Sequence, residues 1–385
     1  MSDILYHRPA LAARLSKLIL QVAVGSAASS GVFLAAPRRT GKSTFAREDL
    51  RPALEAAGAV VLYADLWKDL TKDPGQVIVD AVREAVGRHE GFITRLAKSS
   101  GMDKVAVGGV SFSLDKIGLG KDIDLTTALV ALSDETGKII VLMIDEAQHA
   151  ITTAEGVAAL FALKAARDEL NSSRHHGLRI VCTGSNRDKL AMLRNSKEQA
   201  FFGASMVQFP MLDQDFIQWL CENLDLPCAL DPATLYPLFK ETGYRPELLG
   251  AAADEIRFDF AIDPTAIPDR FAQLVREQAD ELHANLRKVL RSLTPIQSAV
   301  IRIMSVMGDA YAPFEAPTLL LYAKAMATAG VEPSAIKVEV TGVQQALIAL
   351  QEKKLVWKAS RGVYAVDEHV IIDLLRADGM LEGLS

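Results

Sequence analysis

Cysteine is scarce in this chain of 385 residues, which has three, at positions 182, 221 and 228. Their spacing fits neither a disulfide framework nor a set of metal ligands, so we expect a protein of a reducing compartment, the cytoplasm. No stretch approaches the roughly 18–20 consecutive apolar residues that a membrane-spanning helix needs. The N-terminus, with Asp3 and Arg8, also lacks the apolar segment of a secretory signal. We therefore expect neither a membrane protein nor a secreted one.

Aromatic residues and net positive charge are also low. Aromatics make up 6% of the chain, while 50% is hydrophobic and much of that is alanine, which is typical of a helix-rich soluble protein. The 42 Lys and Arg against 48 Asp and Glu give a net charge of −6. This excludes a surface that is basic throughout, although one local basic patch for nucleic acid is still compatible with it. The length predicts two or three domains, at roughly 100–200 residues each.

Apolar strands alternate with amphipathic helices over the first 207 residues. Runs of strand length occupy residues 31–36, 59–65, 138–145 and 178–183. Such continuous hydrophobicity is typical of an α/β protein whose parallel sheet carries helices on both faces. Residues 105–114 (VAVGGVSFSL) instead alternate valine with serine and glycine, which predicts an inserted β-hairpin.

The pattern changes twice in the second half of the chain. From residue 213 to about residue 290 it is purely helical. Three further helical segments follow, near residues 295–307, 316–328 and 339–352. After them come two strand-like runs, 354–357 and 363–366, separated by a Ser-Arg-Gly turn. Three helices and a terminal hairpin predict a winged helix-turn-helix.

The segment APRRTGKST, residues 36–44, matches the phosphate-binding P-loop except that Ala36 replaces the first glycine. Such a loop curls backbone N–H groups around phosphates at a helix N-terminus, while a lysine reaches the β and γ oxygens and a hydroxyl binds Mg²⁺. Gly41, Lys42 and Ser43 supply these parts between a predicted strand and a predicted helix. Alanine is acceptable at position 36 where φ stays negative. The alternative is a chance Gly-Lys-Ser in a strand–helix loop. The other expected nucleotide-binding residues of the loop are Pro37, Arg38, Arg39, Thr40 and Thr44.

A second motif follows about 100 residues later, where Val141-Leu142-Met143-Ile144 runs into Asp145 and Glu146. This is the Walker B arrangement, common alone but specific when a P-loop precedes it. A strand adjacent to the P-loop strand would bring Asp145 to the water shell of Mg²⁺. Glu146 would then orient and deprotonate the attacking water.

Two further motifs offer polar side chains to the same site. Ser185 and Asn186, in Thr-Gly-Ser-Asn at the end of the next strand, are expected to contact the γ-phosphate or the water; an ordinary helix cap is the alternative. Arg245, in Gly-Tyr-Arg-Pro at a helix start, can reach the phosphates and stabilise transition-state charge. Its alternative is a surface turn.

Together these motifs resemble the AAA+ and STAND classes of P-loop ATPases, and most of all their archaeal-ATPase (MNS) branch. The resemblance covers nearly the whole chain. It rests on six segments: APRRTGKST, YADLW (63–67), VAVGGVSFSL, VLMIDEAQH (141–149), CTGSN (182–186) and GYRPELL (243–249). It implies an AAA+-like nucleotide-binding core over residues 1–209, with a hairpin insert at about 104–115. An α-helical lid over 210–288 and a winged helix domain over 289–385 would follow.

The resemblance also implies ATP and Mg²⁺ at the junction of core and lid, with Ser43 and Asp145 as metal ligands and Arg245 as the lid's sensor. Tyr6 and Arg8 match a segment that packs near the adenine in such proteins. Relatives often complete the site with an arginine from a neighbouring subunit, for which Arg187 and Arg194 are candidates. Arg38 and Arg39 are the alternative source of positive charge.

Basic residues gather around the predicted wing, although basic and acidic residues nearly balance in the last hundred positions. Phosphate contacts of duplex DNA are expected there, from Lys353, Lys354, Lys358 and Arg361. The alternative is a winged helix that binds protein or inhibits its own chain. Three functions therefore stay open: an ATPase acting with DNA, a signalling or defence ATPase with a protein partner, and an ATP-binding transcription regulator with little turnover. Assembly into a homo-oligomer is compatible with each.

Overall fold

The computed structural model of the chain describes residues 5–23, 25–36, 38–88, 114–172, 175–185, 187–195, 197–360 and 362–384. The predicted hairpin lies outside these ranges except for its last two residues, which begin a 3₁₀ turn, Leu114–Lys116. Pro37, Asn186 and Arg361 lie outside them as well. The chain forms two compact units. We call residues 7–35 and 43–208 the core unit, and residues 1–6, 36–42 and 209–385 the C-terminal unit. The predicted domain boundaries stay predictions.

The core unit is built on a five-stranded sheet in the order β2-β3-β4-β1-β5, and each neighbouring pair is parallel. Its strands are β1 (Val32–Ala35), β2 (Val60–Asp65), β3 (Ile140–Asp145), β4 (Leu178–Gly184) and β5 (Ser205–Gln208). The expected adjacency of the P-loop strand and the Walker B strand is wrong, because β4 pairs with both and separates β1 from β3. The connection from β1 to β2 skips two positions of the sheet, and the later strands β3 and β4 fill them.

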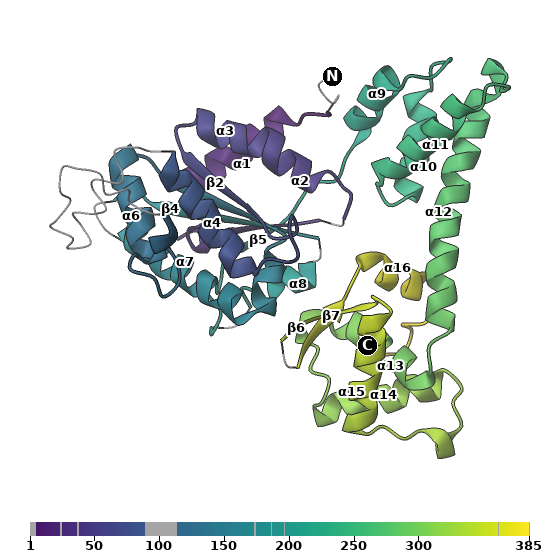
Figure 1. The fold of residues 1–385 in the computed structure, drawn as a ribbon. Helices are drawn as coiled ribbons and strands as arrows, with labels where there is room; N and C mark the ends of the chain where they lie inside the picture. The colour runs from purple at the N-terminus through teal and green to yellow at the C-terminus, as the bar shows by residue number, and fades with distance from the viewer. Residues whose placement is uncertain are drawn as a thin grey trace. The chain divides into compact units, whose positions relative to one another are not determined.

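Helices cover both faces of this sheet, as predicted (Figure 1). One group comprises α1 (Pro9–Leu20) and α3 (Arg51–Ala56), and the other comprises α4 (Pro74–Gly87), α6 (Leu125–Thr136) and α7 (Ala154–Ser172). All of β3 is buried. Leu142 and Ile144 share a core with α4, α6 and α7, and Val141 and Met143 point to the other face because side chains alternate along a strand. This double burial explains the unbroken apolar run of the sequence.

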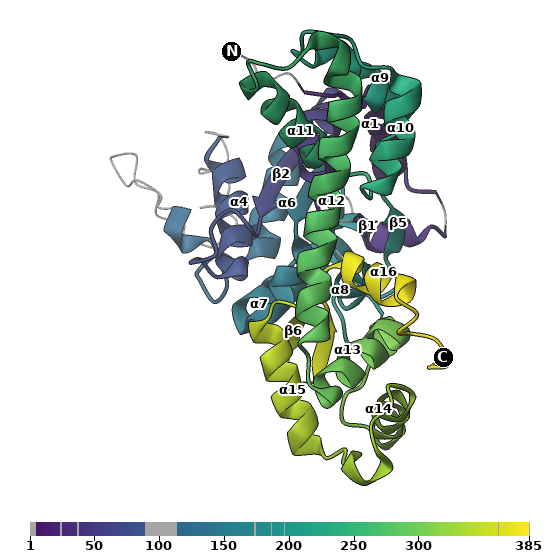
Figure 2. The ribbon, with the colours of Figure 1, turned by 90° about the vertical axis from the view of Figure 1, so that its right-hand side faces the viewer.

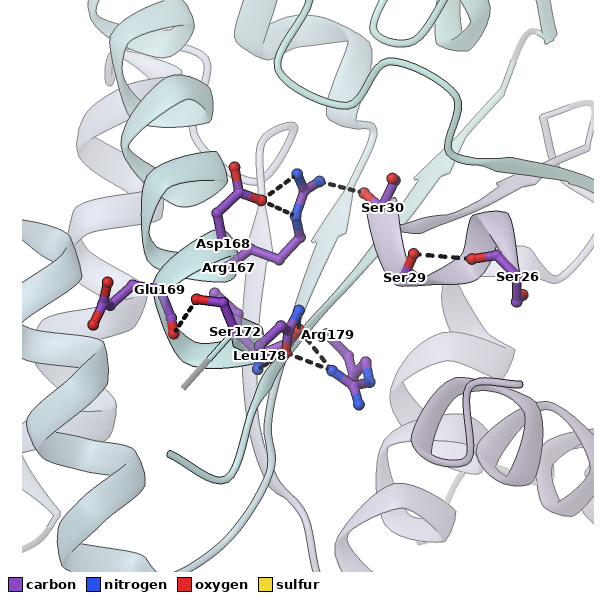
Figure 3. Close-up of polar contacts among 10 residues, drawn as sticks. Ser26, Ser29, Ser30, Arg167, Asp168, Glu169, Ser172, Leu178 and Arg179 are labelled. Atoms are coloured by element: carbon purple, nitrogen blue, oxygen red, sulfur yellow. Dashed lines mark hydrogen bonds and ion pairs between the residues drawn. The ribbon is translucent and has the colours of Figure 1, made fainter. Parts of the chain in front are cut away.

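The amino-terminal edge of the sheet is tied to α7 by arginine side chains (Figure 3). Arg167 donates to the carbonyl oxygen of Ser30, just before β1, at 2.8 Å, and it also pairs with Asp168. Arg179 at the start of β4 donates to Asn171 of α7 at 2.7 Å. These contacts fix the edge of the sheet opposite to the one where ligands of parallel α/β sheets bind.

The C-terminal unit contains a helical group and a winged helix-turn-helix, each with its own apolar core. The helical group consists of α9 (Gln214–Asn223), α10 (Pro232–Glu241), α11 (Pro246–Phe258) and the long α12 (Ile267–Arg291). Figure 2 shows α12 running from this group to the winged helix. The winged helix consists of α13 (Pro295–Met307), α14 (Ala316–Thr328), α15 (Val340–Glu352), the antiparallel strands β6 (Val356–Ser360) and β7 (Val363–Val366), and α16 (His369–Ala377). The sequence patterns predicted these helices and the hairpin, but neither α16 nor β5. No helix in the described ranges combines the length and the apolar composition that crossing a bilayer requires.

Glycines allow the start of α7 to pack closely against α4 and against the 3₁₀ turn Ala147–Thr152 that precedes α7. A Cβ atom at Gly75, near the start of α4, would lie 2.5 Å from the carbonyl oxygen of Glu155. A Cβ atom at Gly156, at the start of α7, would lie 2.2 Å from the carbonyl oxygen of Ala150. Backbone atoms cannot yield as a flexible side chain can, so only glycine fits at these two positions.

We expect Gly75→Ala to lower the free energy of unfolding by about 1–3 kcal/mol, because the added methyl group overpacks the contact between the helices. Gly250→Ala is the matched control, since no atom lies within 4 Å of a Cβ atom at this position of α11. It should raise the free energy of unfolding by up to about 1 kcal/mol, the difference in helix propensity. Urea denaturation measures both, and an unchanged midpoint for Gly75→Ala would contradict the close approach.

Candidate functional site

The P-loop segment follows β1 directly and leads into the short helix α2 (Lys42–Phe45). Ala36 is buried and does not have a positive φ, which explains why alanine is accepted there. Left-handed backbone occurs instead at Arg39, with φ 62°, and at Gly41, with φ 77°. A left-handed residue among right-handed ones turns successive N–H groups into a concave anion site. Thr40 and Lys42 are buried, Ser43 is half-buried and Thr44 is exposed.

The arginines that are predicted to bind phosphates are paired with carboxylates in the C-terminal unit. Arg245 precedes α11 and donates from Nε to Oε1 of Glu247 at 2.5 Å. A guanidinium nitrogen of Arg39 lies 3.6 Å from the same oxygen. Arg38 lies 3.5 Å from Oε1 of Glu368, which precedes α16. Three of the expected phosphate ligands therefore already contact an anionic group.

The Walker B carboxylate of Asp145 is buried at the end of β3, with 2% of the residue exposed. Its Oδ1 accepts from the Thr183 hydroxyl and from the Glu146 N–H at 3.1 Å. Its Oδ2 accepts from the Tyr63 hydroxyl at 2.8 Å. The parallel register brings these groups together, because β2 and β4 flank β3 and end at the same edge. Hydroxyl donors thus hold both oxygens of the carboxylate.

Glu146 follows in the left-handed region, with φ 52°. For a residue other than glycine the left-handed conformation costs roughly 1–2 kcal/mol, and such backbone strain clusters at functional sites. Oε2 of Glu146 accepts from the Ser185 hydroxyl at 2.9 Å and from Nε2 of the buried Gln148 at 2.5 Å. Ser185, which the sequence places near the γ-phosphate, contacts the Walker B glutamate here. Gly184 permits this packing, because a Cβ atom there would lie 2.6 Å from Oε1 of Gln148.

Sequence reasoning missed several members of this network. Tyr63 and Thr183 lie inside the motifs YADLW and CTGSN, yet the motifs alone give neither of them a role. Arg47 lies outside every motif; it donates to the Tyr63 hydroxyl oxygen at 3.2 Å and pairs with Asp65. Burial, and then the Asp145 charge, raise the pKa of Tyr63 far above its usual range. The phenol therefore stays protonated and donates at neutral pH.

The other predicted residues lie outside the network around Asp145. The Tyr6 ring packs against Phe216 of α9, with 5.3 Å between centroids, and Arg8 precedes α1. Arg187 is exposed at the start of α8 (Arg187–Ala191), whereas Arg194 donates to the carbonyl oxygen of Ala204. Lysines are exposed at the end of α15 and on β6, namely Lys353, Lys354 and Lys358.

Comparison with known proteins identifies the fold. No protein-family model and no curated protein sequence matches the chain. The structure of the Aeropyrum pernix ORC2 protein in its ADP form is similar, with a TM-score of 0.53 and 16% identity over 98% of this chain and 96% of that one. The chain has the AAA+ P-loop ATPase fold with a C-terminal domain.

Two further solved structures match over nearly their whole length. The ADPNP–ADP complexes of the Aeropyrum pernix ORC2 protein give a TM-score of 0.47 at 15% identity, covering 99% of this chain and 95% of that chain. The Aeropyrum pernix ORC1 protein in complex with DNA gives 0.42 at 16% identity, covering 100% and 95%. The fold assignment rests on the ADP-form structure.

We expect Thr183→Val to lower the free energy of unfolding by about 1–3 kcal/mol, because it removes a hydroxyl donor from a buried carboxylate at nearly constant volume. Thr136→Val is the control, since the Thr136 hydroxyl donates only to carbonyl oxygens of its own helix. Its effect should stay within about 0.5 kcal/mol. Equal losses of stability for the two variants in urea denaturation would show that the bond to Asp145 adds nothing to stability.

Proposed function

We propose that this protein is an Mg²⁺-dependent AAA+/STAND-type ATPase of the archaeal-ATPase (MNS) branch. The observation that carries the proposal is the pair of motifs on one parallel sheet: the P-loop segment follows β1, and Asp145-Glu146 ends β3. The ADP in the similar ORC2 structure supports an adenine nucleotide as ligand. We place the nucleotide-binding core at residues 1–209, the lid at 210–288 and the winged helix domain at 289–385. Tyr6 and Arg8 would lie near the adenine.

The oxygen ligands at this edge of the sheet fit Mg²⁺. Ser43 offers a hydroxyl and Asp145 a carboxylate, and Mg²⁺ is usually held by one or two protein oxygens together with waters and substrate phosphates. When bound, the ion would neutralise charge on the β and γ phosphates. Lys42 would add its ammonium charge to the same phosphate oxygens.

Hydrolysis would depend on Glu146 as the base that orients the attacking water and accepts its proton. Ser185 and Gln148 support this role, because their bonds to Oε2 fix the direction of the carboxylate. Asn186 would contact the γ-phosphate or the water. Arg245 would exchange Glu247 for phosphate oxygens and stabilise the charge of the transition state. Arg187 or Arg194 of a neighbouring copy would complete the site in a homo-oligomer.

Lys42→Ala should abolish ATP binding, because the phosphates lose their buried cation, whereas Glu146→Gln should keep ATP binding and lose turnover. Titration with a fluorescent ATP analogue and steady-state phosphate release measure the two properties. Lys68→Ala, an exposed lysine of the core unit, serves as control for loss of one positive charge. Unchanged ATP affinity in Lys42→Ala would refute the site assignment. Tight binding without turnover in the unaltered protein would instead favour the transcription regulator.

We further propose that the winged helix binds duplex DNA. The supporting observation is the exposure of Lys353, Lys354 and Lys358 where α15 ends and β6 runs. Lysine ammonium groups at such positions contact phosphates and bind without reading sequence. A protein partner of this domain, as in a signalling or defence ATPase, is the competing proposal.

Replacing Lys353, Lys354 and Lys358 together with glutamine should weaken binding of a short duplex. The plot of the logarithm of the association constant against the logarithm of the salt concentration has a negative slope. Its magnitude should fall by about 0.9 for each phosphate that the variant no longer neutralises. The control replaces the exposed Arg291, Lys324 and Lys337 with glutamine, which removes the same charge from the same domain. Fluorescence anisotropy at several salt concentrations measures both. Equally weakened binding in the two triple variants would indicate general electrostatic attraction and contradict a DNA site at the wing.

A further inference from the structure

The helix that follows the P-loop is linked to the Walker B carboxylate by an unbroken series of side-chain contacts. Residues Ala46–Leu50 continue α2 as a π-helical segment. Arg47 of this segment donates from Nε to the Tyr63 hydroxyl oxygen at 3.2 Å. The Tyr63 hydroxyl in turn donates to Oδ2 of Asp145 at 2.8 Å. All of these residues belong to the core unit.

Each contact in this series constrains the next. A phenol has one proton, and because it donates that proton to Asp145, its oxygen is the acceptor for Arg47. Arg47 is itself held by the Asp65 carboxylate, and Asp65 lies directly opposite Asp145 in the register of β2 and β3. Donation by the guanidinium polarises the hydroxyl and strengthens its own donation, as in other hydrogen-bond chains.

Tyr63 and Thr183 donate hydrogen bonds to the two different oxygens of the Asp145 carboxylate and thereby fix the plane of the carboxylate. A carboxylate held by one donor can still rotate about its Cβ–Cγ bond. Each carboxylate oxygen has a second lone pair, so these hydrogen bonds leave the carboxylate able to bind a metal ion or a metal-bound water. Groups that orient a metal ligand in this way typically contribute about 10–100-fold to metal affinity or activity.

We propose that Arg47 and Tyr63 are positioning residues that orient Asp145 for Mg²⁺ and couple the position of the helix after the P-loop to that orientation. This inference rests on the proposed function, because it needs a nucleotide at the P-loop and Mg²⁺ at Asp145. The π-helical segment supports it, since single π-turns within helices are frequent at functional sites. A shift of α2 when phosphates bind would reach Asp145 through Arg47 and Tyr63, without any contact between the nucleotide and Tyr63.

The test measures the affinity of the full chain for a fluorescent ADP analogue, first in EDTA and then in a titration with MgCl₂. In Tyr63→Phe, affinity in EDTA should equal that of the unaltered protein, whereas the Mg²⁺ concentration for half-maximal effect should rise about 10–100-fold. Arg47→Gln should raise this Mg²⁺ concentration less. In the Tyr63→Phe background it should cause no further rise, because the effect of Arg47 passes through the phenol. The matched control is Arg51→Gln, an arginine one turn later that pairs with Glu55 of its own helix at 2.9 Å.

The possible outcomes separate this inference from the proposed function. If the unaltered protein binds no nucleotide, the proposed function fails and this inference fails with it. If nucleotide binds but Tyr63→Phe and Arg47→Gln respond to Mg²⁺ like Arg51→Gln, only the positioning role is overturned. If the single effects of Arg47→Gln and Tyr63→Phe add in the double variant, the coupling through Tyr63 is overturned. Should Tyr63→Phe fold poorly in circular dichroism, Arg47→Gln against Arg51→Gln decides, because Arg47 is exposed.

Discussion

The buried carboxylate of Asp145 is the constraint on which the arrangement of the core unit depends. A charge that is removed from water must be met by hydrogen-bond donors or a cation, and otherwise it costs several kcal/mol. The donors come from both neighbouring strands: Tyr63 from β2 and Thr183 from β4. Only a strand order that places β3 between β2 and β4, with their carboxyl ends level, supplies both. The order of the strands therefore determines which hydrogen-bond donors reach the buried carboxylate at the edge of the sheet.

Backbone strain marks the same motifs. In the described ranges, four residues other than glycine have the left-handed conformation that such residues rarely adopt: Arg39, Glu146, Tyr244 and Lys354. The first three lie in the P-loop segment, at the Walker B glutamate and beside Arg245, respectively, and Lys354 follows the end of α15. Turns elsewhere in the described residues mostly use glycine for this conformation, for example Gly137 and Gly203. A side chain is thus kept at these three positions despite its cost, which is expected where the side chain or its neighbour acts on a ligand.

The sequence was sufficient for the fold class, because unbroken apolar strands, amphipathic helices and a terminal hairpin are local patterns. It was also sufficient to recognise the P-loop and Asp145-Glu146 as motifs. The order of the strands could not be predicted in this way, since β1, β3 and β4 carry similar apolar runs and the helical crossovers decide which pair. The partners of Asp145 were missed for a related reason. Tyr63 precedes it by 82 residues and Thr183 follows it by 38, so only the register brings them together. β5 has four residues, half of them polar, and gave no strand signal.

The carboxylates that pair with the predicted phosphate ligands can be ranked by how readily phosphate would replace them. The Arg39–Glu247 pair spans 3.6 Å with the Arg39 side chain 66% exposed, so it contributes about 0–1 kcal/mol and is easily displaced. The Arg245–Glu247 bond is shorter, 2.5 Å, and both side chains are mostly buried, 20% and 28% exposed. Breaking it would leave Glu247 without its donor, and Oε2 of Glu247 is already buried without a partner. Under the proposed function, recruitment of Arg245 is therefore the costlier step. It would occur only when the phosphate attracts the guanidinium more strongly than Glu247 does, so Arg245, at the start of α11, would respond to the phosphates of the nucleotide only at that cost.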